Sequence, residues 1–204
     1  MPTISIAPYF PFRRVRIASQ RLTCEGSIIR IEPDLRYIPQ CGRCGTPARR
    51  IHSEKRRLIR DLDLAGTRVW LDCRIRKVVC PCCRKVRVER LEFHDVGRRV
   101  TKRLARYIHE LCKLMSVSDV SRRTALNHKT IKAIDKLFLK EEFGRIDFSS
   151  LRLLAVDEVS ERKGHRYLTI VMDYETERVL YVGKKPRART LKRFFRMLSR
   201  RQRR

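Results

Sequence analysis

The sequence predicts a multi-domain α+β protein built from three successive segments. Before residue 95, apolar residues recur with a period near two, which is typical of strands. From Val100 they recur at steps of three and four, as on the buried face of a helix. After Gly144, short apolar runs return and precede one more helical pattern. We therefore expect segments at residues 1–95, 96–145 and 146–204.

The first segment is expected to hold a hairpin followed by a metal-binding β module. Strands are predicted at residues 14–19, 27–32, 69–75 and 86–88, with a turn at Gly66. Two CxxC pairs flank the longest β-patterned stretch, and their members are Cys41, Cys44, Cys80 and Cys83. Two intervening residues let both sulfurs of a pair face one ion, and four thiolates suit tetrahedral Zn²⁺. We predict a zinc ribbon with one structural zinc ion.

Other assignments of the cysteines remain open at this stage. Buried or disulfide-bonded cysteines are the alternative to metal, but paired CxxC motifs without a secretory signal favour metal. Within the second pair, Cys82 lies beside Cys83, and His94 follows eleven residues later. Either could replace a ligand, although the CxxC spacing favours Cys83. Because the module has few apolar residues, we expect metal binding to contribute on the order of 10 kcal/mol to its folding.

The central segment reads as a helix-turn-helix bundle. Helices are predicted from Val100, over residues 117–124, and after an N-cap at Asn127 with Ile131, Ile134 and Leu137 facing inward. The tight turn contains Ala125, where a small residue is needed. Four residues lie at the exposed start of the recognition helix and are predicted to contact DNA: Asn127, His128, Lys129 and Lys132. A packing bundle with solvated cations is the alternative.

The charge of the chain supports a nucleic-acid partner. Fifty Lys and Arg against 22 Asp and Glu give a net charge of +28, which attracts polyanions. An anionic membrane surface would also attract it, but no apolar run approaches the roughly 20 residues that span a bilayer. An RNA partner is supported by charge alone, because the aromatic residues form no stacking platform. We therefore favour DNA.

The last segment begins like an α/β domain, with three strands and then a helix. Strands are predicted at residues 151–156, after Gly164 at 167–172, and at 179–182. A helix is predicted to start at Thr190, with its apolar face formed by Leu191, Phe194, Phe195 and Leu198. This is half of an α/β domain.

A carboxylate at the end of the first of these strands is the candidate catalytic residue. Asp157 follows a compact apolar strand, which would hold a metal ligand rigidly. Glu158 points to the opposite face, because side chains alternate along a strand. Asp173 also ends a strand, but it precedes a turn in which Asp is a favoured residue. We therefore select Asp157.

The order of these segments resembles an insertion-sequence transposase of the ISL-three family. The matching stretches are the two knuckles, residues 60–66, Val156-Asp157-Glu158 followed by residues 163–169, then 179–183 and 189–191. The resemblance implies a zinc-binding N-terminal domain, a helix-turn-helix and a ribonuclease-H-like catalytic domain. It further implies a DDE mechanism in which three carboxylates hold two Mg²⁺ ions.

Within that resemblance, Asp157 matches the first carboxylate, while the second Asp and the Glu would lie beyond Arg204. The resemblance therefore implies a truncated transposase in the bacterial cytoplasm, associated with the nucleoid. It would bind double-stranded DNA at the terminal inverted repeats of its element without strand transfer. Homo-oligomerisation and the DNA sequence recognised stay open. The alternative is a small zinc-ribbon and helix-turn-helix regulator without catalytic activity.

Overall fold

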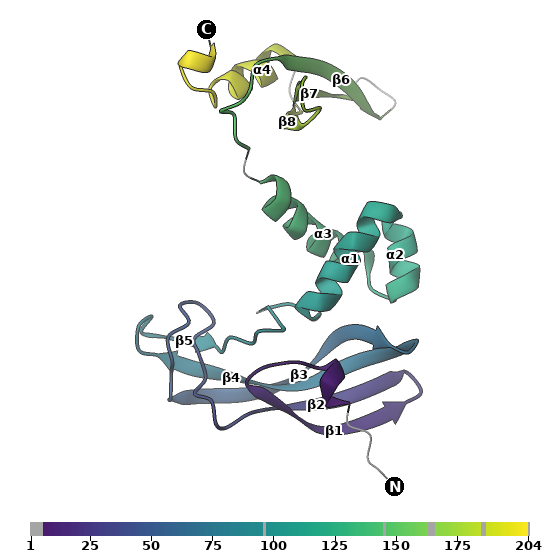
Figure 1. Ribbon diagram of the computed structural model, residues 1–204, viewed down its shortest axis with the longest axis vertical. Coiled ribbons are helices and arrows are strands. Elements are labelled where there is room, and N and C mark those ends of the chain that lie inside the picture. The colour runs from purple at the N-terminus through teal and green to yellow at the C-terminus, as the bar shows by residue number, and fades with distance from the viewer. Residues whose placement is uncertain (1–5, 96, 145, 163–165, 185–186, 204) are drawn as a thin grey trace. The chain divides into compact units, whose positions relative to one another are not determined.

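A computed structural model describes residues 6–95, 97–144, 146–162, 166–184 and 187–203 (Figure 1). The chain divides into two compact units, Met1–Phe138 and Leu139–Arg204. The first unit contains the five-stranded sheet and the first helices, and the second contains a three-stranded sheet with one helix. No described helix is long and apolar enough to cross a membrane.

The sheet of the first unit has the strand order β1-β2-β4-β3, and β5 pairs with the C-terminal end of β4. The bounds are β1 Val15–Thr23, β2 Gly26–Pro33, β3 Ile51–Leu64, β4 Thr67–Cys80 and β5 Lys85–Val88. All four predicted strands are confirmed, and each is longer than expected. The β1–β2 and β3–β4 pairs are antiparallel hairpins, whereas β2 pairs with β4 in parallel through residues 27–31 and 69–73. The N-terminal hairpin is thereby part of the same sheet as the cysteine pairs.

One face of this sheet carries a substantial hydrophobic core. Because side chains alternate, apolar residues of β2, β3 and β4 share this face, and the buried ones are Ile29, Ile31, Ile59, Val69, Leu71, Cys73 and Ile75. Phe10, Leu91 and Phe93 from the flanking segments complete the cluster, and Phe12 stacks on Phe93 with ring centroids 4.3 Å apart. The few apolar residues of the strands still form a core, because the segments before β1 and after β5 fold over this face and add their own apolar side chains.

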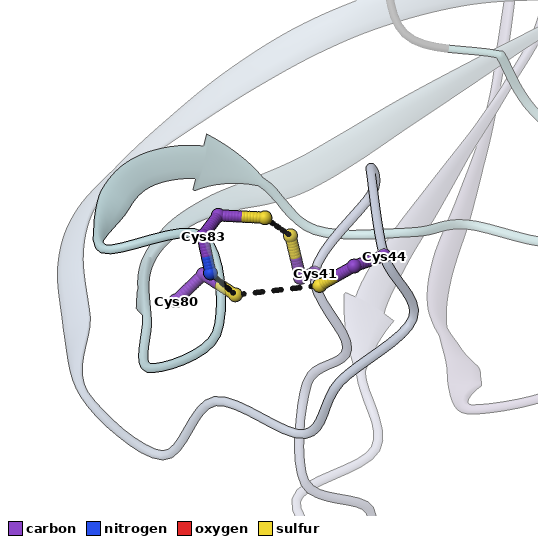
Figure 2. A group of neighbouring side chains, drawn as sticks. All are labelled: Cys41, Cys44, Cys80 and Cys83. Atoms are coloured by element: carbon purple, nitrogen blue, oxygen red, sulfur yellow. Dashed lines mark hydrogen bonds between the residues drawn. The ribbon is translucent and has the colours of Figure 1, made fainter.

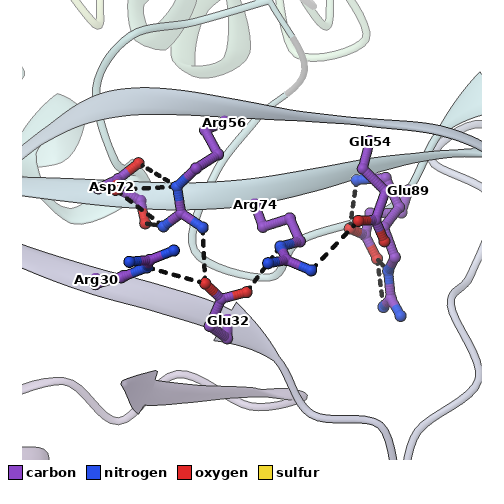
Figure 3. A network of polar contacts seen from close by, with 8 residues as sticks. Arg30, Glu32, Glu54, Arg56, Asp72, Arg74 and Glu89 are labelled. Carbon is purple, nitrogen blue, oxygen red and sulfur yellow. Dashed lines mark hydrogen bonds and ion pairs between the residues drawn. The ribbon is translucent and has the colours of Figure 1, made fainter. Parts of the chain in front are cut away.

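The opposite face of the sheet carries a network of ion pairs (Figure 3). Glu32 accepts from Arg56 at 2.7 Å and from Arg74 at 2.9 Å. Asp72 accepts from Arg56 at 3.0 Å. Burial alone would raise the pKa of Glu32, but bonds from Arg56 and Arg30 hold that pKa below its ordinary value. The arginines of this face are therefore largely neutralised by acidic neighbours.

Three helices follow the sheet and form the predicted helix-turn-helix arrangement. Their bounds are α1 Lys102–Leu114, α2 Val117–Thr124 and α3 His128–Phe143. Ser116 caps α2, and Ala125 ends it with a left-handed φ of 56°. This conformation allows the sharp turn into α3, and a small side chain reduces its cost. Ile131 and Ile134 are buried as predicted, but Leu137 is 36% exposed and Phe138 packs on the cluster instead.

Polar contacts between β3 and the start of α1 join the sheet to the helices. Arg60 donates its backbone N–H to Arg99 at 2.8 Å and accepts one from Thr101 at 2.9 Å. Asp61 is completely buried and accepts hydrogen bonds from the Thr101 hydroxyl and the Arg103 Nε, both at 2.7 Å. The guanidinium of Arg103 also lies over the ring of Phe12. The connection between the two parts is thus a bonded junction.

The second unit consists of an antiparallel sheet, β6-β7-β8, covered on one face by α4. The bounds are β6 Leu154–Arg162, β7 Arg166–Asp173, β8 Val179–Gly183 and α4 Arg187–Phe195. Val171, Leu180, Phe194 and Leu198 form its buried core. Gly164, predicted to open the second strand, lies outside the described residues, as do Lys163 and His165.

Three sequence-based expectations for this unit were wrong. The first strand starts at Leu154 and continues to Arg162, so Asp157 lies within the strand and not at its end. Pairing with β7 extends the strand past the apolar run, because backbone hydrogen bonds do not require apolar side chains. The helix begins at Arg187, ahead of Thr190, and Phe195 is 39% exposed.

Candidate metal centre and nucleic-acid interface

Four cysteine sulfurs converge at one end of the first sheet (Figure 2). The Sγ atoms of Cys41, Cys44, Cys80 and Cys83 all lie within 4.8 Å of one another. The Cys44–Cys80 distance is 3.5 Å and the Cys41–Cys83 distance is 3.9 Å. A tetrahedral zinc ion with Zn–S bonds of about 2.3 Å needs sulfurs about 3.8 Å apart. The donor set therefore fits Zn²⁺ in number, type and spacing.

Backbone hydrogen bonds form the two knuckles that present these sulfurs. Cys41 donates its N–H to Thr46, and Gly45 donates to Cys41, both at 2.9 Å. In the second knuckle, the N–H of Cys83 points to the Cys80 sulfur at 3.3 Å. A Cβ at Gly42 would lie 2.6 Å from the carbonyl oxygen of Val88, so the first knuckle approaches β5 too closely for any other residue.

A buried ion pair holds the first knuckle against β4. Arg76 and Glu89 have almost fully buried side chains, and Nη2 lies 2.6 Å from Oε2. Glu89 also accepts from the backbone N–H of Arg76 at 2.8 Å and forms a β-bridge with Cys41. The strand β4 and the first knuckle are thereby fixed to each other. Sequence periodicity could not identify Glu89, since its partner lies thirteen residues away.

The pKa values of the thiols show that the four sulfurs do not ionise equally. Hydrogen bonds with the Thr46 side chain and backbone lower the pKa of Cys44 to about 6. The neighbouring Cys44, together with burial and Cys80, raises the pKa of Cys83 to about 12. Crowding four thiolates together is unfavourable without a cation. A divalent metal supplies that charge, which is why thiol deprotonation accompanies zinc binding.

Neither alternative ligand belongs to this cluster. Cys82 is exposed and is absent from the group of converging sulfurs. His94 is buried, and its Nδ1 lies 3.3 Å from the carbonyl oxygen of Val100. Burial lowers the pKa of His94. Its position at the junction with α1 suits a structural role.

The four predicted DNA contacts lie together at the start of α3, on its exposed side. Asn127, His128, Lys129 and Lys132 are all exposed. The Asn127 side chain accepts the backbone N–H of Lys129 at 2.8 Å, which confirms the predicted cap. The side-chain oxygen of Asn127 is therefore engaged in the cap. The side chains of His128, Lys129 and Lys132 face solvent.

A pair that the sequence did not indicate fixes α3 against α1. The Nδ1 of His109 lies 2.8 Å from Asp135, and the His109 ring stacks on Phe138 with centroids 4.8 Å apart. His109 is buried within an otherwise apolar helix face. The only available signal was a histidine at an inward position of the helical repeat. The contact sets the orientation of the helix that carries the predicted DNA contacts.

The candidate catalytic carboxylate stands on the open face of the second sheet. Asp157 is exposed and pairs with Ile170, and its Oδ1 accepts the backbone N–H of Glu158 at 2.7 Å. Glu158 points to the other face, where the Thr169 hydroxyl lies 3.5 Å away. Asp173 caps its own turn through Glu175 and Thr176. Among the residues that the structure describes, no acidic group joins Asp157 in a cluster of three or more ligands.

Three family descriptions match successive parts of this chain. Residues 39–83 match the zinc-finger of transposase IS204/IS1001/IS1096/IS1165. Residues 89–138 match the helix-turn-helix domain of transposase family ISL3, and residues 154–204 match a transposase family. The first match includes all four converging cysteines, and the second includes the exposed start of α3.

Curated relatives are similar over most of this chain. It is 35% identical over 158 residues to the transposase for insertion sequence element IS1001 of Bordetella parapertussis. It is 28% identical over 172 residues to the transposase for insertion sequence element IS1557 of Mycobacterium tuberculosis. These regions are 78% and 82% of this chain but 39% and 38% of the relatives, so the chain spans about two fifths of their length. No solved structure gave a significant match.

Proposed function

This chain belongs to the ISL3 family of insertion-sequence transposases, and from that premise we propose that residues 1–138 bind double-stranded DNA at the terminal inverted repeats of an insertion sequence. The observation that carries the proposal is the exposed cluster at the start of α3, on a helix whose inner side is fixed by buried contacts. Such a helix can enter a major groove with its N-terminal residues facing the bases. The net charge of +28 supplies the general attraction to DNA.

In this proposal, the zinc ion has a structural role. Bound by Cys41, Cys44, Cys80 and Cys83, it would cross-link the two knuckles and supply no chemistry to DNA. The hydrogen bond between Thr101 and Asp61 fixes the start of α1 to the same sheet. The ribbon therefore acts as the support of the helix-turn-helix. Binding of this kind would take place on the bacterial chromosome.

Removing two cations from the start of α3 tests the DNA-binding proposal. Lys129→Gln/Lys132→Gln should weaken binding to an inverted-repeat duplex by about tenfold or more, because phosphate or base contacts are lost. Fluorescence anisotropy with a labelled duplex measures the effect. Arg16→Gln/Arg21→Gln is the charge-matched control, since both arginines are exposed on β1 at the opposite edge of the sheet from β3. Equal losses in both variants would assign the binding to net charge alone.

The same duplex tests the catalytic part of the proposal. We propose that Asp157 is the first carboxylate of a two-metal site and that this chain alone binds DNA without cutting it. Among the described residues, Asp157 belongs to no group of three or more metal ligands, so the three carboxylates that a metal pair needs are not assembled here. We expect no strand cleavage on a denaturing gel with Mg²⁺ or Mn²⁺. Metal-dependent cleavage that Asp157→Asn abolishes would refute this.

A regulator without catalytic activity remains the second candidate. It is favoured by the contrast between the bonded sheet and helices of the first unit and Asp157, which joins no cluster of three or more metal ligands among the described residues. Selection of bound sequences from a random duplex pool separates the two proposals. Enrichment of a sequence unrelated to any insertion-sequence end would favour the regulator.

A further inference from the structure

A basic groove runs along the outer edge of β3, apart from the start of α3. Its volume is about 500 Å³, and its lining includes Lys55, Arg56, Arg57, Arg98, Arg99 and one acidic residue, Asp72. Leu58 and Ile59 are the apolar residues of its lining. Such a groove is polar and open, which suits a charged polymer better than a small apolar ligand.

The charge in the groove is not neutralised by its one carboxylate. Asp72 is already bound to Arg56, which also donates to Glu32 at 2.7 Å (Figure 3). Arg98 approaches Asp95 only at 4.0 Å. Among the described residues, no acidic side chain forms an ion pair with Lys55, Arg57 or Arg99, and all three are exposed. Three cations therefore face solvent from one groove.

The fold holds these cations in place from two directions. Lys55 and Arg57 are two residues apart and so lie on the same face of β3, which is fixed by its antiparallel pairing with β4. The segment that carries Arg99 is tied to the same strand, because Arg60 donates to the Arg99 carbonyl oxygen at 2.8 Å. The next two residues, Val100 and Thr101, lead directly into α1. The groove is thus part of the same bonded junction that supports the helix-turn-helix.

Charged residues on an edge strand also have a simpler explanation. Lysine and arginine at such an edge prevent pairing with a strand of another chain. That explanation accounts for Lys55 and Arg57, but it does not account for Arg98 and Arg99, which come from a loop. Convergence of two segments on one groove favours binding of an anion.

We propose that this groove is a sequence-independent clamp for the phosphate backbone of the duplex DNA that α3 contacts. The inference rests on the proposed DNA-binding function and names a second contact surface for it. Arginine guanidinium groups bind phosphate oxygens in bidentate geometry, which suits Arg57 and Arg99. Because phosphates are the same at every sequence, the groove contributes affinity and salt dependence but no base preference.

The test measures how binding to a labelled random-sequence duplex depends on salt, using the full chain loaded with zinc. Each lost phosphate contact should reduce the slope of log K against log salt by about 0.9, so Arg57→Gln/Arg99→Gln should reduce it by about 2. Affinity at moderate salt should fall about tenfold. Arg57→Lys/Arg99→Lys should recover most of the slope, since it restores the charges.

Each outcome decides between specific alternatives. The control Arg16→Gln/Arg21→Gln should leave the slope unchanged, and an equal reduction in both variants would overturn the clamp. An unchanged slope in the groove variant would also overturn it while leaving the proposed function intact. A wild-type chain that fails to bind duplex DNA would instead remove the proposed function. The same variants are also tested with a labelled single-stranded RNA. If the groove substitutions weaken RNA binding but leave duplex DNA binding unchanged, the groove is assigned to RNA. Zinc content and thermal unfolding of each variant confirm that it is folded.

Discussion

Cys83→Ser is expected to abolish tight zinc binding and to unfold the zinc end of the first sheet. The substitution removes one of four sulfurs that lie within 4.8 Å of one another. Structural zinc contributes on the order of 10 kcal/mol to the folding of small metal domains, so the unfolding free energy should fall by several kcal/mol. Atomic absorption measures the zinc content, and urea unfolding followed by the fluorescence of Trp70, near the start of β4, measures the unfolding free energy of the sheet.

The neighbouring cysteine provides the matched control for this prediction. Cys82→Ser should keep one zinc ion per chain and the wild-type melting temperature, because the Cys82 side chain is exposed and outside the cluster. Cys24→Ser, also exposed, controls for thiol removal elsewhere. If Cys82→Ser loses the zinc and Cys83→Ser retains it, the assignment of the second knuckle is wrong.

Asp61→Asn is expected to destabilise the first unit by about 3 kcal/mol. The carboxylate is completely buried, and it is the acceptor for Thr101 and for the guanidinium of Arg103. Removing its charge leaves Arg103 without its ion-pair partner at the junction between sheet and helices. The cost is at the lower end of the range for buried pairs, because about a third of the Arg103 side chain is exposed. Urea unfolding followed by circular dichroism gives the free energy.

An exposed pair is the appropriate comparison for Asp61. Glu110→Gln breaks the contact with Lys113, in which both side chains are about half exposed, and should cost less than about 1 kcal/mol. Similar stabilities for Asp61→Asn and the wild type would show that the junction contributes little. The DNA affinity of Asp61→Asn should also fall, since the groove and α1 meet at this junction.

Features set by neighbouring residues were predictable from the sequence. Asn127 caps α3 as predicted, because its side chain reaches a backbone N–H group two residues ahead. The CxxC spacing fixes two sulfurs of each knuckle locally, so the pairing of the two knuckles was the only long-range inference required. The period of two located β1, β2, β4 and β5, but it did not predict β3, Ile51–Leu64, which is rich in charged residues.

Features set by distant partners were not predictable. Asp61 reads as part of an acidic turn-like stretch, and its burial depends on Thr101 and Arg103, forty and more residues later. Asp157 was placed at a strand end because the apolar run stops there, whereas the strand continues along β7 through Glu158 and Ser160. Backbone hydrogen bonds to a neighbouring strand require no particular side chains on an exposed sheet face, so the sequence pattern does not reveal them.

The parallel pairing of β2 with β4 has a consequence for biosynthesis. As the chain leaves the ribosome, β2 emerges with only β1 as a neighbour, and its second partner follows some forty residues later. Cys44 emerges 36 residues before Cys80, so for that interval only two of the four zinc ligands, Cys41 and Cys44, have been synthesised. Closing such a long segment is slow compared with forming a hairpin. Metal capture and completion of the sheet therefore both wait until the second knuckle and β5 have been synthesised.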